Sequence, residues 1–282
     1  MKKIAIVTDS SAYLPAEILK ENDIHIIPLK INWDGETYLD GIDISPSQFY
    51  ERLVKSKTLP TTSQPSMGEF LELFNQLSAN YDGIVTLLIS SGISGTVGSA
   101  EAAKEGFTKI PVVIIDSLST SAALGMATEA AAHAASEGKG LNEIEHIARE
   151  MISRAKTFFV VDTLEYLHKG GRIGGASRYL GNALNIKPIL YLNEEGKIDA
   201  LEKVRTKSKA TNRLLELAEE YVDGRPVVVG LIHANRLEEI MKLREKVEQR
   251  FNCEKMDVYE LSPVIGTHVG PGTLGIAIYP KI

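Results

Sequence analysis

The sequence predicts an α/β fold made of two domains, and three observations support this prediction. Short apolar runs rich in β-branched residues alternate with longer segments whose apolar residues recur at the helical period. Such alternation is typical of layered folds in which helices cover a sheet. The chain has 282 residues, more than one compact domain usually contains. Its hydrophobic content of 44% is ample for a sizeable core.

The first domain is predicted to span residues 1–160 as a Rossmann-like layered sheet. Its strands are expected at residues 3–7, 24–31, 83–89 and 111–115. Ser45 and Ser66 precede the first clear helical segments, and serine is a preferred N-cap residue. Helices are expected at residues 48–54, 67–77, 120–136 and 141–155. The third of these is rich in alanine, which lets neighbouring layers approach closely.

The second domain is predicted to span residues 161–282 as a smaller α/β sandwich. The chain passes into it somewhere within residues 155–165, after the apolar run at 157–161. Strands are expected at residues 186–192, 198–203, 227–233, 258–261 and 274–279, with helices at 210–221 and 237–251. No Pro-rich or Ser-rich linker marks the boundary, so we expect the two domains to share an extensive interface.

Composition and charge exclude several classes of protein. The net charge of -6 argues against binding to nucleic acid or an anionic membrane, since neutralising phosphates needs a basic face. The apolar run at residues 4–7 stops far short of the ~7 to 15 residues of a secretory leader. No segment approaches the ~18 apolar residues of a membrane span, so we expect a cytoplasmic protein.

The sequence also predicts no disulfide, no metal site and no bound nucleotide cofactor. Cys253 is the single cysteine and cannot form a disulfide within the chain. The spacing of His, Cys and carboxylate residues does not resemble a zinc site. The glycine-rich motifs that bind nucleotide phosphates after a strand are not found.

Three segments rich in small hydroxyl residues indicate a site for a polar or anionic group. They are residues 8–11, 61–66 and 90–96. Hydroxyl and backbone N–H groups near helix starts can donate several hydrogen bonds to one small oxyanion. Each segment also has a simpler interpretation, because Asp9, Ser66 and Ser94 are all residues that cap helices.

Two further segments carry cationic or titratable groups. His268 lies in the glycine-rich segment 266–273, which we expect to be a loop, and an imidazole there could donate to a carboxylate or act as a base. The run from His168 to Arg172, with Gly170 and Gly171, could bind phosphate or a partner, and Arg205 could join it. The alternative is that the two glycines simply end a short helix.

Two other functions fit parts of this pattern. Residues 92–96 nearly match the G-x-S-x-G motif of hydrolases, with Thr96 at the final glycine position. A serine hydrolase would use Ser94 as nucleophile, His268 as base and Asp9 or Asp116 to orient the base. A sugar-binding or phosphate-binding domain would instead have a polar, water-filled cleft.

Seven segments in order closely resemble the DegV family across essentially the whole chain. These are residues 8–11, 60–66, 90–100, 164–174, 185–190, 203–206 and 266–272. The resemblance implies a protein that binds a long-chain fatty acid in an apolar tunnel. It also implies that a separate ATP-dependent fatty-acid kinase phosphorylates the bound carboxylate, so the chain itself is not an enzyme.

The resemblance also assigns roles to residues. Thr62 and Ser94 match the hydroxyls that hold the carboxylate, with Thr61, Ser63 and His268 completing the head-group site. Arg172 and Arg205 match residues that face the kinase or the phosphoryl group. Val97-Gly98 departs from the pattern of many relatives, which have Tyr and a polar residue there; this difference affects the nearby pocket wall.

Overall fold

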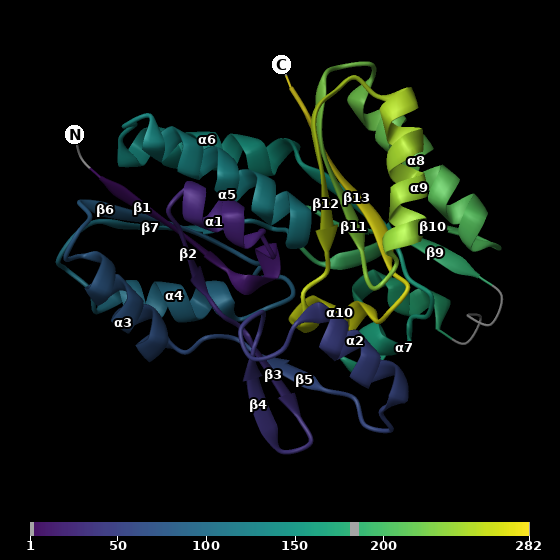
Figure 1. Ribbon diagram of the computed structural model, residues 1–282, viewed down its shortest axis with the longest axis horizontal. Helices are drawn as coiled ribbons and strands as arrows, with labels where there is room; N and C mark the ends of the chain where they lie inside the picture. The colour runs from purple at the N-terminus through teal and green to yellow at the C-terminus, as the bar shows by residue number, and fades with distance from the viewer. Residues whose placement is uncertain (1–2, 181–185, 282) are drawn as a thin grey trace.

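The computed structural model describes residues 3–180 and 186–281, and it contains two main sheets (Figure 1). The first sheet is parallel, with strand order β2-β1-β6-β7. Its strands are β1 (Ile4–Asp9), β2 (Ile24–Ile27), β6 (Gly83–Leu88) and β7 (Val112–Asp116). Strands β1 and β6 are buried along their whole length, as expected for central strands covered on both faces.

Helices cover both faces of this sheet (Figure 1). One face carries α1 (Ala16–Glu21), α5 (Ser121–Ser136) and α6 (Leu141–Arg154), and the other carries α3 (Met67–Leu77) and α4 (Thr96–Glu105). The predicted serine caps are confirmed. Ser66 and Glu69 form a reciprocal capping box at the start of α3, and Ser45 and Gln48 form another at α2 (Pro46–Lys55).

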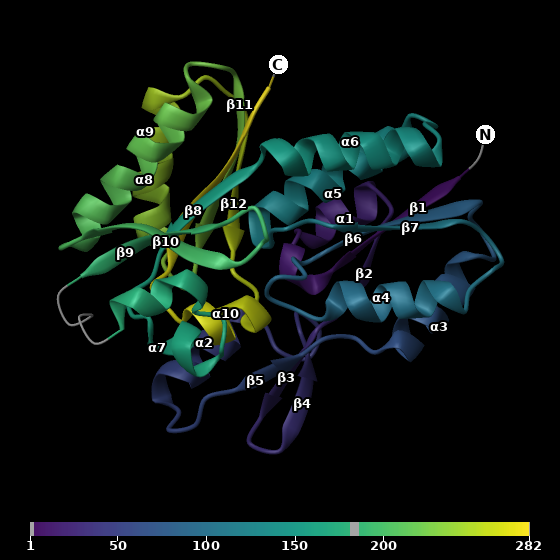
Figure 2. The same cartoon turned by 180° about the vertical axis from the view of Figure 1, so that it is seen from behind.

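The second sheet has six strands in the order β10-β9-β8-β13-β11-β12. They are β8 (Lys156–Val160), β9 (Lys187–Leu192), β10 (Ile198–Val204), β11 (Val227–His233), β12 (Cys253–Glu260) and β13 (Leu274–Pro280). Helices α8 (Lys207–Val222) and α9 (Leu237–Arg250) cover its outer face (Figure 2). Asn185, which begins one of the family motifs, lies outside the described residues.

The two helix-covered sheets confirm the α/β class predicted from the sequence.

The two sheets share one hydrophobic core. A single cluster of buried side chains includes Ala122 on α5, Phe159 on β8 and Ile232 on β11. The chain passes from the first sheet to the second at Ala155, between α6 and β8. Strand β8 thus belongs to the second sheet, whereas the sequence assigns residues up to 160 to the first domain.

A small antiparallel sheet with strand order β4-β3-β5 lies below the first sheet in Figure 1. It contains β3 (Lys30–Trp33), β4 (Glu36–Leu39) and β5 (Thr61–Ser63). The prediction of one strand over residues 24–31 is wrong, because Pro28 separates β2 from β3 and proline cannot donate to a strand ladder. The first part of the hydroxyl-rich segment 61–66 forms strand β5, with Thr62 opposite Ile31 on β3.

The prediction of a loop over residues 266–273 is also partly wrong. Its first half is the last part of helix α10 (Pro263–Val269). The Oγ of Ser262 accepts the N–H of Ile265, and Pro263 occupies the first turn, so the local sequence starts a helix. Gly270 then ends the helix with a φ of 74°, a conformation that glycine adopts without strain.

The remaining short elements are η1 (Ser10–Ala12), α7 (Glu165–Lys169) and η2 (Gly174–Tyr179). Helices α5 and α8 are the longest in the described part of the chain, with 16 residues each. A membrane-spanning helix needs about 20 residues. Within residues 3–180 and 186–281, every helix is too short or too polar to cross a membrane.

Candidate functional site

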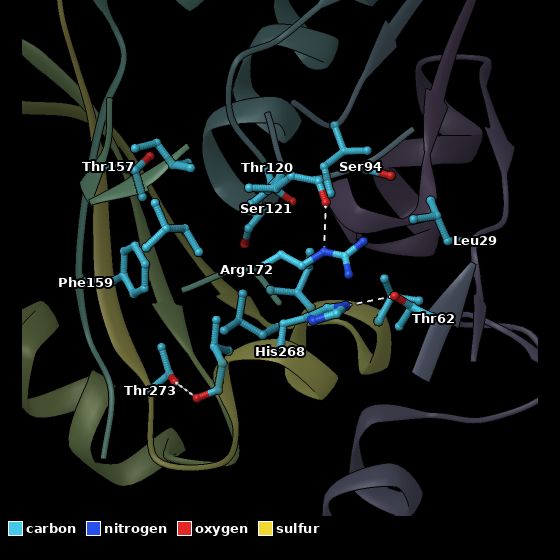
Figure 3. A pocket seen from close by; sticks show the side chains of 18 of the residues that line it. Leu29, Thr62, Ser94, Thr120, Ser121, Thr157, Phe159, Arg172, His268 and Thr273 are labelled. Carbon is cyan, nitrogen blue, oxygen red and sulfur yellow. Dashed lines mark hydrogen bonds between the residues drawn. The ribbon is translucent and has the colours of Figure 1, made fainter. Parts of the chain in front are cut away.

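A pocket that is partly open to solvent lies where β5, the second sheet and α10 meet (Figure 3). Apolar side chains form much of the wall: Leu29, Ile89, Ile93, Phe159, Leu192, Ile198, Ile232, Leu261, Val264, Ile265 and Val269. An apolar wall of this extent favours a ligand with a long hydrocarbon part.

Most of the site residues predicted from the sequence line this pocket. They are Thr62, Ser63, Ser94, Arg172 and His268. Thr61 is exposed on β5, and Arg205 is exposed between β10 and α8; neither belongs to the pocket lining. We therefore do not expect Thr61 to contact a ligand in this pocket.

The side chains of Asp40 and Tyr50 fix the start of α10. Asp40 accepts the N–H of Val264 at 3.2 Å with one carboxylate oxygen and the hydroxyl of Ser10 at 2.7 Å with the other. Tyr50 donates its hydroxyl to the carbonyl of Leu261 at 3.1 Å. Burial raises the pKa of Asp40 to about 7. These contacts tie the helix that carries His268 to the other half of the molecule.

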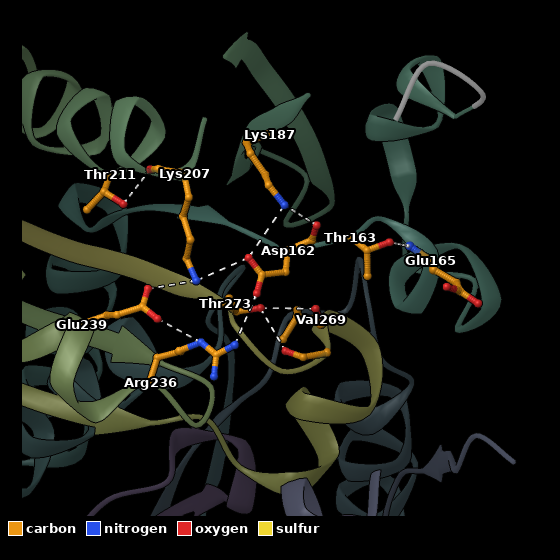
Figure 4. Close-up of polar contacts among 11 residues, drawn as sticks. Asp162, Thr163, Glu165, Lys187, Lys207, Thr211, Arg236, Glu239, Val269 and Thr273 are labelled. Carbon is orange, nitrogen blue, oxygen red and sulfur yellow. Dashed lines mark hydrogen bonds and ion pairs between the residues drawn. The ribbon is translucent and has the colours of Figure 1, made fainter. Parts of the chain in front are cut away.

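The side chain of Thr273 helps to fix the end of α10 (Figure 4). The Thr273 hydroxyl donates to the carbonyls of Val269 and Gly270, at 3.2 and 3.1 Å. The carboxylate of Asp162 lies so close to Gly272 that any Cβ there would overlap it. Asp162 in turn pairs with cations, at 3.3 Å from Lys207 and at longer distances from Lys187 and Arg236.

His268 therefore has a fixed position on the pocket wall. Its Nε2 lies 2.8 Å from the Oγ1 of Thr62, and which atom donates depends on the imidazole tautomer. Among the described residues, its buried Nδ1 has no hydrogen-bond partner. Burial, and to a smaller extent the charge of Arg172, lowers the pKa of His268 to about 4. At neutral pH the imidazole is uncharged.

Gly170 makes room for this imidazole. It ends helix α7 as its C-cap, as the helix-termination interpretation expects. A Cβ at Gly170 would also overlap the Nδ1 of His268. Gly171 differs, because it has a φ of 71° and open space where a Cβ would be. Gly170 thus leaves space for His268, whereas Gly171 allows the left-handed backbone conformation after α7.

Ser94 lies in the loop between β6 and α4. Its Oγ is 2.8 Å from the Oγ1 of Thr96. The loop is held against the β9–β10 turn, since Ser90 donates its hydroxyl to the carbonyl of Gly196 at 2.8 Å. Gly92 packs on the backbone of the same turn so tightly that a Cβ would collide with it. Ser94 is therefore placed on the pocket wall by a loop that packs against the β9–β10 turn.

Arg172 lines the same pocket as Ser94. Its Nε donates to the carbonyl of Ile93 at 3.1 Å, and its Nη1 donates to the carbonyl of Gly170 at 2.8 Å. No carboxylate in the described part of the chain pairs with it. A guanidinium has five N–H groups, so Arg172 keeps donors for a ligand.

The arrangement gives no support to a serine hydrolase. The partner of Ser94 is Thr96, and the partner of His268 is Thr62. Asp9 is fully buried, and its oxygens accept the N–H groups of Ser11 and Ile89. The carboxylate of Asp116 accepts backbone N–H groups in its own and the neighbouring loop. In the described chain no carboxylate orients His268 as a triad requires.

Three hydroxyls of the pocket were not predicted from the sequence: those of Thr120, Ser121 and Thr157. Thr120 and Ser121 follow β7, beyond the carboxyl end of the parallel sheet. In open α/β sheets, ligands bind at this edge. The position of Thr120 and Ser121 after a strand could therefore have identified them as site residues. Thr157 gave no such signal, because a threonine inside a strand is ordinary.

Comparison with known proteins gives a family match over nearly the whole chain. The family model described as "Uncharacterised protein, DegV family" matches residues 3–281. Protein DegV of Bacillus subtilis is 39% identical over 275 residues, which cover 97% of this chain and 98% of that protein.

Solved structures also match this chain over nearly its whole length. A DegV family protein from Thermus thermophilus, described by its fatty-acid binding, has a TM-score of 0.93 at 32% identity and covers 99% of this chain and 100% of its own. DegV from Bacillus subtilis, described as a fatty-acid-binding protein, has a TM-score of 0.92 at 38% identity, with both chains fully covered. A stearic-acid-binding protein from Eubacterium ventriosum has a TM-score of 0.89 at 27% identity and covers 100% of this chain and 99% of its own.

Replacing Gly170 by Ala is predicted to displace His268, because the added methyl group overlaps the imidazole. The distance between His268 Nε2 and Thr62 Oγ1 in a crystal structure of the variant measures this effect, and we expect the hydrogen bond to be lost. Gly171→Ala is the matched control, since its cost of about 1 to 2 kcal/mol arises from backbone strain and leaves His268 in place. An unchanged distance in Gly170→Ala would contradict the account.

His268 is predicted to make the protein less stable in acid. Its pKa is about 4 in the folded chain and 6.5 when unfolded, so only the unfolded state gains its proton between these values. The stabilisation is complete above pH 6.5, and up to about 3 kcal/mol is lost as the pH falls to 4.

Denaturant unfolding of wild type and His268→Gln across this pH range measures the effect. The free energy of unfolding of wild type should fall by more than that of the variant. The comparison separates His268 from Asp40, whose raised pKa acts in the opposite direction. Parallel pH profiles for the two proteins would show that His268 is not buried in its neutral form.

Proposed function

The chain belongs to the DegV family, and on that premise we propose that it binds a long-chain fatty acid in this pocket. The carboxylate lies at Thr62, Ser94 and His268, with Ser63 beside them, and the acyl chain lies along the apolar wall. The observation that carries the proposal is the combination of an apolar pocket with a wall of neutral hydrogen-bonding groups. The fatty-acid binding of structurally similar relatives supports it.

The acyl chain supplies most of the binding free energy. Burying one methylene group contributes about 0.8 kcal/mol, so a long chain offers roughly 10 kcal/mol before ordering costs. A polar, water-filled cleft would instead favour a sugar or a free phosphate. The pocket wall, with Phe159, Leu192 and Ile232, does not fit such a ligand.

The head-group residues supply orientation rather than bulk affinity. Hydrogen bonds to a charged group contribute about 1.5 to 3 kcal/mol each. Thr62 and Ser94 are uncharged, and His268 is neutral at pH 7 because of its lowered pKa. A bound carboxylate next to His268 favours the protonated imidazole, so binding raises the pKa of His268.

We further propose that a separate ATP-dependent fatty-acid kinase acts on the bound carboxylate. A carboxylate oxygen attacks the γ-phosphorus of ATP and forms an acyl phosphate, while the bond to ADP breaks. Neutral hydroxyl donors leave the carboxylate more nucleophilic than a close ion pair with arginine would. Arg172, with donors to spare, and the exposed Arg205 face the kinase or the transferred phosphoryl group. The chain acts as a cytoplasmic carrier and not as an enzyme by itself.

Replacing Thr62 by Val or Ser94 by Ala is predicted to weaken stearic acid binding by about tenfold to a hundredfold, because one hydrogen bond to the carboxylate is lost. Titration of lipid-free protein with stearic acid measures the dissociation constant. Thr61→Val is the matched control, since Thr61 is exposed on the same strand and should bind like wild type. Wild-type affinity in both pocket variants would contradict the head-group assignment.

Arg172→Ala is predicted to slow acyl-phosphate formation at least tenfold at saturating fatty acid, because a charged donor near the phosphoryl group is removed. The assay uses a bacterial fatty-acid kinase and ATP, with fatty-acid affinity measured in the same samples to separate binding from transfer. Arg149→Ala is the control, because Arg149 lies on α6 and, among the described residues, pairs only with Glu145. A wild-type rate in Arg172→Ala would refute its role toward the kinase.

A further inference from the structure

Three hydroxyls that line the pocket have no hydrogen-bond partner in the described part of the chain. They are the Oγ1 of Thr120, the Oγ of Ser121 and the Oγ1 of Thr157, and each oxygen is buried. Ser121 and Thr157 are only 2% and 9% exposed. Buried hydroxyls in proteins nearly always have partners, so three orphans around one cavity need an explanation.

These hydroxyls are distinct from the proposed carboxylate site. The hydroxyls of Thr62 and Ser94 already have partners, His268 and Thr96. Figure 3 shows Thr157 beside Phe159, across the pocket from Thr62, with Thr120 and Ser121 between the two ends. The pocket therefore has polar groups at a second place along its length, where an unsubstituted acyl chain offers only methylene groups.

The start of α5 adds further donors at this place. Thr120 is the N-cap of this 16-residue helix, yet its side chain makes no capping hydrogen bond. The first backbone N–H groups of a helix have no partner within the helix, and the helix dipole favours an electron-rich atom there. Because Thr120 and Ser121 line the pocket, this helix end borders the same space as their hydroxyls.

We propose that Thr120, Ser121 and Thr157 form a second polar subsite, which binds an oxygen substituent on the acyl chain. The inference rests on the proposed function, with the carboxylate held near Thr62. A hydroxyl group fits because serine and threonine side chains both donate and accept hydrogen bonds. The subsite thus accommodates a hydroxy fatty acid whose hydroxyl reaches it.

The test compares stearic acid with a set of hydroxystearic acids that differ only in the position of the hydroxyl. In wild type, at least one isomer should bind as tightly as stearic acid. In the variant Ser121→Ala/Thr157→Val, the same isomer should bind about tenfold more weakly than stearic acid, because its hydroxyl is buried without partners. Thr157→Val alone, which preserves the shape of the side chain, should show a smaller shift in the same direction.

Thr86→Val is the matched control. Thr86 on β6 also has a buried hydroxyl without a partner among the described residues, but it does not line the pocket. Its replacement should leave the ratio of the two affinities unchanged, and thermal unfolding of each variant verifies that it is folded.

Two results would overturn the subsite. One is that every hydroxy isomer binds wild type at least tenfold more weakly than stearic acid. This result would mean that the hydroxyls of Thr120, Ser121 and Thr157 bind only water. The other is that the affinity ratio is the same in wild type and the double variant. Failure of stearic acid itself to bind wild type is a different result, and it would overturn the proposed function.

Discussion

The burial of α10 is the constraint on which the site depends. A helix of seven residues leaves most of its terminal N–H and C=O groups without partners inside the helix. Ser262 and Asp40 accept N–H groups at its start, and Thr273 donates to carbonyls at its end. Because both ends are fixed, His268 reaches Thr62, which lies 206 residues earlier in the chain.

The same burial determines the chemistry of the site. A low dielectric disfavours charge, so His268 stays neutral and the nearest donors are hydroxyls. Arg172 lines the pocket and also a second groove, which the loops around Gly95 and Gly171 form. A site of this kind directs a carboxylate by hydrogen bonds, while the hydrocarbon chain provides the affinity.

Sequence patterns predicted those features that depend on local physics. The periodicity of apolar residues and the capping residues identified the main helices and strands, including the starts of α2 and α3 at Ser45 and Ser66. The hydroxyl segments and His268 pointed to pocket residues, and the family resemblance selected Thr62 and Ser94 among them.

The features that local patterns could not predict depend on contacts between distant segments. The assignment of residues 61–63 to a strand requires the partner strand β3, and a short hydroxyl run has no strand period of its own. The position of His268 depends on Gly170, which lies nearly a hundred residues earlier in the chain. From the sequence alone, the two adjacent glycines indicate only the end of a helix. Thr157 is one of many threonines in strands, and only the fold shows that its hydroxyl lines a cavity.

A crystal structure of the protein with stearic acid tests the central claim most directly. The account predicts one fatty acid per chain, with a carboxylate oxygen about 3 Å from the Oγ1 of Thr62 and the acyl chain extending past Phe159. A fatty acid bound in the reverse direction, with its carboxylate at Thr157, would contradict the account. A ligand bound outside the space between β5, α10 and the second sheet would contradict it as well.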